Sequence, residues 1–412
     1  MMIRLFLRKY IRIPIMIIIG YLFLFYPYVF QKLFGIQNEI PFLLGGLLFF
    51  LIQYVLSFKK TSNIPSFLKK CILIQILFWF LFCFIHSDTS YLVRCLVILL
   101  TFLMLTYLGR HKLLFKFCAI YNVVIGTQVF LGSVAFILIF CGLLSPITTF
   151  ENVDGREAYC YGLTCSNYVV GNLIRIAGYF DEPGALAYWG VFALLFNKLF
   201  INNKIVEFTL VIGLFFTLSA AYFVQIALYF IFFYFTHLKK NIIPLILILS
   251  LVFVGFQKLG TNDVVASYTV ERFAGGKIQS SRTELSMVAK RAFLKNPIVG
   301  CGAKKFESMQ YMGDNPFEIP AKDGIVGLII TYLPLILVFL RYYKRKEVLF
   351  AALILSAGYL QRPFHIHILH SFMLYLFVIL LYLKYKVRKK VITSIDSQMV
   401  KKTTKQWHIK FL

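Results

Sequence analysis

Charged residues are scarce in this chain, and acidic ones are the scarcest. Only 15% of the 412 residues are charged, and 17 Asp and Glu stand against 43 Lys and Arg. An ordinary soluble protein is about 25% charged and about 45–50% apolar, whereas this chain is 60% hydrophobic. The shortage of charge therefore excludes a set of ordinary soluble domains. The 45 Phe and 25 Tyr also exclude a disordered chain, because disorder goes with few aromatic residues.

Long apolar segments occupy most of the chain. A membrane helix needs roughly 17–25 mostly apolar residues. Segments that read this way, some of them short, lie near 13–31, 40–57, 71–86, 92–108, 117–144, 184–197, 205–219, 221–236, 242–257, 323–340, 348–362 and 366–383. The stretch 205–236 as one helix would be about 48 Å long, too long for a hydrocarbon core of about 30 Å, so we expect a break at Ser219. The sequence predicts an all-α integral membrane protein with about twelve transmembrane helices.

The net charge of +26 tests this interpretation. With both termini in the cytoplasm, every inner connection is rich in Lys and Arg, while the outer connections are nearly balanced, as the positive-inside rule requires. The basic tail at 384–412 alone resembles a nucleic-acid patch, but a segment facing anionic lipid is the better explanation. We therefore expect membrane lipid and no nucleic acid as partner. The first span lacks a small-residue cleavage site, so we expect it to be retained.

Two predicted outer loops are much longer than the other connections. The regions are an N-terminal five-helix membrane region at 1–144, a first long loop at 145–182, central membrane helices at 183–257, a second long loop at 258–321, C-terminal membrane helices at 322–383 and the tail at 384–412. Both long loops contain aromatic residues and Gly and are not of low complexity. Loops of this length are usually functional or disordered. We therefore expect an extracytoplasmic functional site in them.

Cysteine and histidine spacing offers little sign of a metal site. Most of the eight Cys lie in apolar spans, where a thiol is a small buried hydrophobe. Cys160 and Cys165 lie in the first long loop, where a disulfide and two free thiols are equally acceptable. The cluster of His365, His367 and His370 comes closest to a ligand set, but a hydrogen-bonded interfacial cluster is favoured because no third ligand shares its helix face. No carboxylate cluster resembles a Mg²⁺ site, so we predict neither metal nor cofactor.

The first long loop ends in R-I-A-G-Y-F-D-E-P-G, which leads directly into a predicted span. Arg175 is always protonated, and its guanidinium can bind phosphate through two parallel bonds. Glu182 suits the positive end of a helix, and Pro183 suits the first helical turn. Two explanations stay open: a well-capped helix with a snorkelling Arg, or an anion-binding Arg beside a carboxylate.

The second long loop contains a predicted amphipathic helix. Ser281 and Glu284 have the spacing of a capping box. Apolar residues then recur at helical spacing, at Leu285, Val288, Ala289, Ala292 and Phe293. Arg291 lies on the polar side, Arg282 lies in the first turn, and Arg272 lies upstream. Such a helix could lie in the membrane interface, roof a cavity and present Arg to an anionic substrate, or simply have a solvated charged face.

Four sequence blocks resemble conserved blocks of the O-antigen polymerase and ligase superfamily. RIAGYFDEPGALAYW at 175–189 resembles its R-x-x-G-x-F-x-E-P signature, and LFFTLSAAY at 214–222 resembles a span that ends in Thr-x-Ser. SSRTELSMVAKRAFLKNPIVGCGAKKF at 280–306 resembles the S-x-R…N-P-x-x-G-x-G block of the large loop, and DNPFEIPAKDGIVGLI, which begins at Asp314, resembles the closing block. The blocks follow the family order between about 175 and 330. The first half of the chain agrees only in topology.

The resemblance implies a glycosyltransferase whose donor and acceptor are both glycans linked to undecaprenyl diphosphate. Ligases of the superfamily resemble H-(N/S/Q)-x9-G at the closing block, with the His as presumed base, whereas this chain has Asp314 and Asn315 there. That departure favours an O-antigen polymerase at the periplasmic face of the bacterial inner membrane. The alternatives are a ligase that moves glycan to lipid A core, and a lipid-linked glycan flippase or other transporter. Transporters typically have repeated halves, and 1–144 shows no similarity to 184–383.

The resemblance also assigns roles to residues. Arg175 and Arg282 are expected to stabilise the departing diphosphate. Glu182, and after it Asp314, is expected to accept the proton of the acceptor hydroxyl. The residues expected to contact substrate are Arg272, Arg291, Tyr179 and Asn315. A chain-length regulator protein is a further partner that the resemblance suggests.

Overall fold

A computed structural model describes residues 40–57, 64–151, 157–167, 169–170, 173–234, 279–309, 315–361 and 367–386, together with Lys32 and Gly35. Within them the chain is mostly helical. Six described helices are long and apolar enough to cross a membrane: Ser66–His86, Ser90–Arg110, Leu114–Phe140, Pro183–Ile201, Glu318–Tyr342 and Ile368–Lys386. The predicted spans near 13–31 and 242–257 and most of the basic tail lie outside the described residues.

The helices follow the predicted apolar segments closely. In chain order they are α3 (Ile40–Leu56), α4 (Ser66–His86), α5 (Ser90–Arg110), α6 (Leu114–Phe140), α7 (Pro183–Phe196) continued by the π-helix η1 (Asn197–Ile201), α8 (Lys204–Gly213), the 3₁₀ helix η2 (Leu214–Thr217), α9 (Ala220–Phe233), α13 (Gln279–Lys295), α14 (Ala303–Glu307), α15 (Glu318–Thr331), α16 (Leu333–Tyr342), α17 (Lys346–Gln361) and a final helix at Ile368–Lys386. The chain is therefore a helical multi-pass membrane protein by the length and composition of these helices. The structure does not establish the predicted number of twelve.

The predicted break at Ser219 is confirmed. η2 ends at Thr217, Leu218 has a left-handed φ of 47°, and α9 begins at Ala220. The hydroxyl of Tyr222 donates to the carbonyl of Val211 at 2.6 Å, so the start of α9 lies beside the end of α8. Farther down, the hydroxyl of Tyr229 donates to Glu207 at 2.6 Å. α8 and α9 therefore form an antiparallel hairpin, which we call the α8–α9 hairpin.

The all-α prediction holds for the membrane helices, but the first long loop contains short strands that it did not include. It contains β1 (Thr148–Glu151), β2 (Glu157–Cys160) and β3 (Cys165–Ser166) in one antiparallel sheet, and β4 (Val169–Val170) pairs with β5 (Leu173–Ile174). A tight turn joins β2 to β3, where the Tyr161 N–H donates to the Thr164 carbonyl at 2.9 Å and Gly162 has a φ of 77°. Strands this short show little periodicity, and their β-branched and aromatic residues suit pairing better than a helix. Cys160 and Cys165 face each other in the β2–β3 register and are free thiols.

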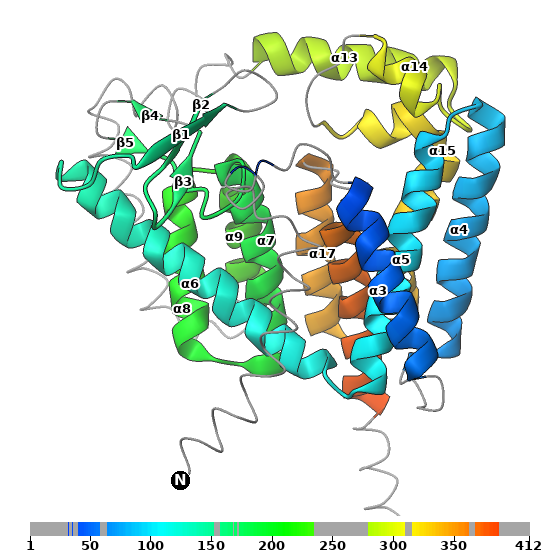
Figure 1. The fold of residues 1–412 in the computed structure, drawn as a ribbon, viewed down its shortest axis with the longest axis horizontal. Helices are drawn as coiled ribbons and strands as arrows, with labels where there is room; N and C mark the ends of the chain where they lie inside the picture. Colours follow the sequence, from blue (N-terminus) through cyan, green and yellow to red (C-terminus); the bar gives the residue numbers. More distant parts are fainter. Residues whose placement is uncertain are drawn as a thin grey trace, which may run out of the picture.

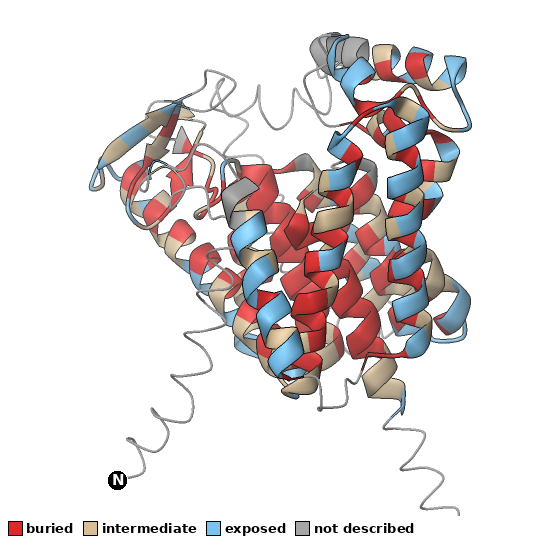
Figure 2. Ribbon diagram, turned by 45° about the vertical axis from the view of Figure 1, so that its right-hand side comes forward, coloured by how far each residue is buried: buried red, intermediate tan, exposed pale blue. Residues whose placement is uncertain are grey.

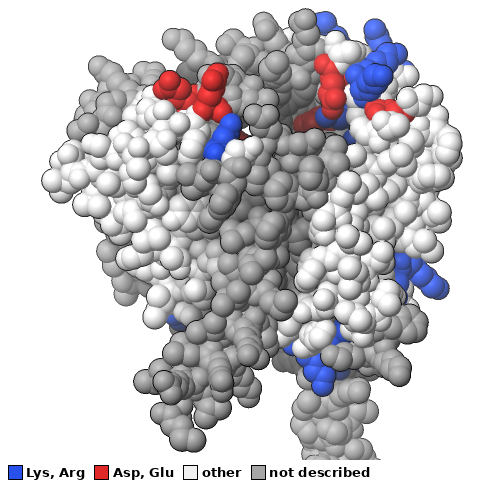
Figure 3. All heavy atoms as spheres, viewed as in Figure 1, with Lys and Arg blue, Asp and Glu red and all other residues white. Residues whose placement is uncertain are grey.

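The strands on one side and α13 with α14 on the other lie at the same end of the helices, which we call the loop end (Figure 1). In Figure 3 the charged side chains visible on one face gather toward the two ends and leave an uncharged band between them. Figure 2 shows exposed residues on the outer faces of the helices around a buried centre. The exposed residues include many large apolar ones, among them Leu48, Val55, Phe84, Val123, Phe130, Ile205 and Phe208. An apolar exterior of this extent is typical of contact with lipid. α7 and the final helix are the most buried of the six long helices.

Candidate active site

Arg175 lies against the turn of the α8–α9 hairpin. The Ile176 N–H donates to the Phe216 carbonyl at 3.2 Å, so the end of the first loop runs beside η2. Arg175 Nε donates to the Thr217 carbonyl at 3.0 Å, and its Nη2 donates to the Leu218 carbonyl at 3.2 Å. Carbonyls at a helix C-terminus lack intrahelical partners and carry partial negative charge, which favours a cation. This contact brings the first and second of the four sequence blocks together.

The backbone beside Arg175 is held by the β2–β3 turn. The Gly178 N–H donates to Thr164 Oγ1 at 2.9 Å, the Cys165 N–H donates to the Gly178 carbonyl at 2.6 Å, and the Ala177 N–H donates to the Cys165 carbonyl at 2.8 Å. Gly178 has a φ of 59°, and a Cβ there would lie 2.9 Å from Gln128 Oε1. The left-handed backbone conformation thus favours the Gly of the first sequence block.

Tyr179 and Glu182 follow on the same segment. Tyr179 is half-buried, and its hydroxyl donates to the Gly162 carbonyl at 3.2 Å. Burial of this phenol raises the pKa of Tyr179 above its usual value. Glu182 is the N-cap residue of α7 with an extended backbone, yet its side chain makes no capping hydrogen bond, while Pro183 occupies the first turn. The structure therefore confirms the helix start at Pro183 and gives no support to Glu182 as its side-chain cap.

α13 is the amphipathic helix predicted in the second long loop. Ala289 and Ala292 are buried in a cluster with Phe306 and Ala321, so the apolar face packs on α15. In Figures 1 and 2 its N-terminal end, which carries Arg282, points from α15 toward the side of the molecule that holds the strands. The side chain of Arg282 lies outside the described residues, as do Arg272 and Asp314 entirely.

The remaining predicted substrate-binding residues, Arg291 and Asn315, lie outside the segment that contains Arg175. Arg291 is exposed, and helical geometry places it away from the face of α13 that packs on α15. Asn315 is buried, and its Oδ1 accepts the Phe317 N–H at 2.7 Å at the start of α15. Of the predicted site residues with described side chains, only Arg175, Tyr179 and Glu182 come from one segment at the α8–α9 hairpin.

The third and fourth sequence blocks pair with each other through backbone hydrogen bonds. The bonds join 297–302 to 321–326, which we call the paired segments: Cys301 N–H to Ala321 O (2.9 Å), Gly302 N–H to Lys322 O (2.9 Å), Ile325 N–H to Pro297 O (2.9 Å) and Val326 N–H to Ile298 O (3.2 Å). Gly300 and Gly324 have positive φ angles of 75° and 67°. A Cβ on Gly300 would lie 2.3 Å from the Lys322 carbonyl oxygen, and one on Gly324 would lie 2.2 Å from that of Ile298. Gly is therefore needed at both positions, because a Cβ would clash with the backbone of the opposite segment.

The paired segments are anchored to the connection between α4 and α5. His86 Nε2 lies 2.9 Å from the Val299 carbonyl oxygen. The carboxylate of Asp88 accepts the backbone N–H groups of Ser90 and Lys304, each at 2.9 Å. Burial alone would raise the pKa of Asp88, but these hydrogen bonds outweigh it and hold the pKa below its usual value.

A buried ion pair joins Asp323 of the paired segments to Arg94 of α5. Arg94 Nη1 and Asp323 Oδ2 are 2.6 Å apart, with side chains only 4% and 0% exposed. The hydroxyl of Tyr91 donates to Asp323 Oδ1 at 2.8 Å, and the Arg94 guanidinium lies 4.8 Å from the Trp79 ring centroid. Sequence reasoning did not single out Arg94. The signal was present, however, because an ionisable residue inside an apolar span marks a functional or structural centre.

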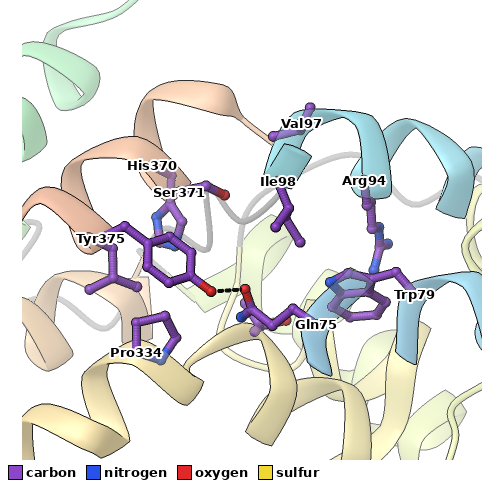
Figure 4. Close-up of a pocket in the computed structure, with 11 residues that line it drawn as sticks. Gln75, Trp79, Arg94, Val97, Ile98, Pro334, His370, Ser371 and Tyr375 are labelled. Atoms are coloured by element: carbon purple, nitrogen blue, oxygen red, sulfur yellow. Dashed lines mark hydrogen bonds between the residues drawn. The ribbon is translucent and has the colours of Figure 1, made fainter. Parts of the chain in front are cut away.

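A small cavity of mixed lining lies beside Arg94 (Figure 4). It is lined by residues of α4, α5, α15, α16 and the final helix, among them Gln75, Arg94, Thr331, His370 and Tyr375, and has a volume of about 20 Å³. The hydroxyl of Tyr375 donates to Gln75 Oε1, the contact drawn as a dashed line. The cavity thus brings polar side chains together from helices that are far apart in the sequence.

The His cluster of the sequence is hydrogen-bonded where it is described. His367 Nδ1 accepts the Leu369 N–H at 3.3 Å, and His370 Nδ1 lies 3.3 Å from the Tyr188 hydroxyl, while His365 lies outside the described residues. Among the residues that the structure describes, no group of three His, Cys, Asp or Glu could hold a metal ion.

Comparisons with known proteins add no assignment. No protein-family model matches the chain, and neither curated proteins nor solved structures give a match. Function therefore has to be inferred from the residues and their arrangement. The two informative features are the Arg175 contact at the α8–α9 hairpin and the paired segments, which the Arg94–Asp323 ion pair joins to α5.

Proposed function

We propose that this chain is an integral-membrane glycosyltransferase that polymerises oligosaccharide repeat units linked to undecaprenyl diphosphate into O-antigen or a related surface polysaccharide. The observation that carries the proposal is the pairing of the four sequence blocks at the loop end. The first block contacts the second through Arg175, and the third pairs with the fourth through the backbone. Sequence blocks that contribute to one reaction are expected to lie close together in the fold. Here the first block contacts the second, and the third contacts the fourth.

The reaction replaces a bond between sugar and diphosphate by a bond between two sugars. Negative charge develops on the departing diphosphate, and positioned cations stabilise it. Arg175 suits this role because its two carbonyl bonds fix the guanidinium at the turn, so less side-chain freedom is lost on binding. Arg282 is the second proposed cation. Glu182, and after it Asp314, is the proposed acceptor of the proton from the attacking hydroxyl.

The proposed orientation places the loop end in the periplasm and both termini in the cytoplasm of a bacterial inner membrane. Basic residues at the opposite ends of the described helices support it, at Lys69, Lys70, Arg110, Lys112, Lys116, Lys198, Lys204 and Arg341. Such residues concentrate on the cytoplasmic side of membrane proteins. The lipid-linked donor and acceptor would reach the site along the apolar exterior. A chain-length regulator protein is the proposed protein partner.

A gel of the surface polysaccharide from a deletion strain separates this function from its alternatives. Loss of a polymerase leaves lipid A core with a single repeat unit, whereas loss of a ligase leaves bare core. Loss of a flippase leaves repeat units on the cytoplasmic leaflet. Bare core in the deletion strain, or cytoplasmic repeat units, would refute the polymerase proposal.

Purified protein in proteoliposomes with an undecaprenyl-diphosphate repeat unit tests Arg175 directly. We expect Arg175→Ala to slow chain elongation by about 10²–10³-fold, the usual loss for one donor that stabilises developing charge. Arg110→Ala is the matched control, because Arg110 Nη1 also donates to a backbone carbonyl, that of Tyr54 at 2.7 Å, near the opposite end of the helices.

Both variants should lose similar stability, and only Arg175→Ala should lose elongation per folded molecule. Elongation at the wild-type rate by folded Arg175→Ala would remove Arg175 from the site. Arg175→Lys adds a finer test, because Lys keeps the charge but lacks the planar fork. Arg175→Lys should therefore recover only part of the wild-type elongation rate.

A further inference from the structure

Cys160 and Cys165 lie opposite each other across the tight turn that joins β2 to β3, two strands of the sheet at the loop end (Figure 1). They are direct partners in the antiparallel register. Both belong to one buried cluster, against which Phe150 and Tyr179 pack. Directly opposed residues of an antiparallel pair share a face of the sheet, so the two thiols lie next to each other in this cluster.

The hydrogen bonds around Cys160 and Cys165 show which kind of antiparallel pair they form. The Cys165 N–H donates to the Gly178 carbonyl, and the Cys165 carbonyl accepts the Ala177 N–H, so both groups point away from β2. On the other strand the Cys160 carbonyl accepts the Ile147 N–H at 2.8 Å. Cys160 and Cys165 are therefore a non-hydrogen-bonded pair, in which the Cα atoms lie about 4.5 Å apart and the side chains are close. A disulfide requires Cα atoms roughly 4.4–6.8 Å apart, so this position admits one.

The burial of the two thiols agrees with a structural bond. Cys160 is 7% exposed and Cys165 is 1% exposed. Burial, together with the neighbouring Cys160, raises the pKa of the Cys165 thiol above its usual value. The thiolate is the reactive form of Cys, so the packed pair reacts slowly. A bond between them would therefore form before the turn packs, and the surrounding residues would then shield it from reductants.

We propose that Cys160 and Cys165 form a disulfide in the mature protein. One thiolate attacks the disulfide of a thiol–disulfide oxidoreductase, and the second thiolate displaces that protein from the mixed disulfide. Two S–H bonds are thereby replaced by one S–S bond, and two electrons and two protons leave with the oxidant, which is released as a dithiol. Such oxidants act in the bacterial periplasm. The compartment therefore rests on the orientation proposed above, whereas the geometry of the pair does not.

The disulfide would hold the turn to which the segment after Arg175 is hydrogen-bonded. Thr164 Oγ1 accepts the Gly178 N–H at 2.9 Å, and the Cys165 N–H donates to the Gly178 carbonyl at 2.6 Å. Both groups belong to residues 160–165, the ring that the bond would close. A closed ring has fewer unfolded conformations. Less entropy is therefore lost when the turn and the segment that carries Arg175 come together.

Peptide mapping of the wild-type protein tests the proposal. Cells are lysed in denaturant with N-ethylmaleimide, so that every free thiol is blocked, and the protein is digested with trypsin. Cleavage after Arg156 and Arg175 releases peptide 157–175, which contains Cys160, Cys165 and no other Cys. We expect this peptide to carry no maleimide and to take up two labels only after reduction. Two labels without reduction would overturn the proposal.

Cys301 provides the control within the same sample. Trypsin releases it in peptide 296–304, which contains a single Cys, and we expect that peptide to be labelled without reduction. Cys165→Ser is the matched variant, because it removes the proposed partner of Cys160. Cys160 should then be labelled without reduction. A Cys160 that stays blocked in this variant would have another partner and would overturn the pairing.

Cys141 separates failure of the bond from failure of the proposed orientation. It is exposed at the C-terminal end of α6, so a membrane-impermeant maleimide should label it in spheroplasts if the loop end faces the periplasm. A dithiol in peptide 157–175 beside a labelled Cys141 would refute the disulfide alone. A dithiol beside an unlabelled Cys141 would refute the disulfide and the orientation together. A disulfide beside unchanged surface polysaccharide in the deletion strain would support the bond and refute the proposed function.

Discussion

Substitution of Gly324 by Ala tests whether the pairing of the third and fourth sequence blocks holds the loop end together. Gly324 has a φ of 67° and a ψ of −169° within α15, a region that residues with a Cβ rarely adopt. Its Cβ would also lie 2.2 Å from the Ile298 carbonyl oxygen. Because that atom belongs to the backbone, rotation of a side chain cannot relieve the clash.

The expected loss can be built from two parts. The backbone conformation alone costs an Ala on the order of 1–3 kcal/mol. Relief of the clash requires the paired segments to separate, which endangers the hydrogen bonds from the N–H groups of Ile325 and Val326. Two such bonds contribute about 1–3 kcal/mol. At an unfolding entropy of about 2.1 cal/mol/K per residue, the sum of about 2–6 kcal/mol corresponds to a fall in melting temperature of roughly 2–7 °C for a chain of 412 residues.

Gly142→Ala is the control for conformation without contact. Gly142 has a φ of 73°, and nothing lies within 4 Å of the position that a Cβ would take there. Thermal unfolding of both variants in the same detergent then isolates the clash. Equal melting temperatures for Gly324→Ala and Gly142→Ala would refute the argument that close backbone pairing makes this Gly necessary.

Two further predictions concern the contacts that hold the paired segments. Arg94→Met should cost about 3–5 kcal/mol, because it leaves the Asp323 carboxylate buried without its cation. Arg94→Met combined with Asp323→Leu should recover part of the loss. Thermal unfolding of the wild type, the single variant and the double variant checks this, and no recovery would argue against an ion-pair origin. Asp88 has a folded-state pKa below its usual 3.8, so its stabilisation is fully present above about pH 3.8 and is lost as the pH falls through the folded-state value. The melting temperatures of the wild type and Asp88→Asn should therefore converge on acidification, and a difference that does not change with pH would contradict the role assigned to this carboxylate.

Local features of the chain could be predicted from the sequence. The apolar segments located the described spans because span length depends only on membrane thickness and helix rise. Helical spacing predicted α13, since Ala289 and Ala292 lie on one face whatever they contact. The break at Ser219 followed from length alone.

Features that depend on partners distant in the sequence could not be predicted. Asp323 is 229 residues from Arg94, and no local pattern connects them. Gly300 and Gly324 stand out in the third and fourth sequence blocks, but the sequence does not show why Gly is needed there. The cause is a backbone segment that passes too close for a Cβ, and this contact exists only in the folded chain. The short strands around Cys160 and Cys165 were missed because pairs of two to four residues carry almost no periodic signal.

The α8–α9 hairpin has a consequence for the lipid around it. α8 with η2 spans 10 and 4 residues, and α9 spans 14, so each arm is only about 21–23 Å long. Ile205, Phe208 and Val224 on these arms are exposed apolar residues. Lipid that meets a hydrophobic segment shorter than the bilayer core of about 30 Å becomes locally thinner. The bilayer surface should therefore dip beside the turn that Arg175 caps, and a diphosphate at the headgroup level would sink with it toward the guanidinium.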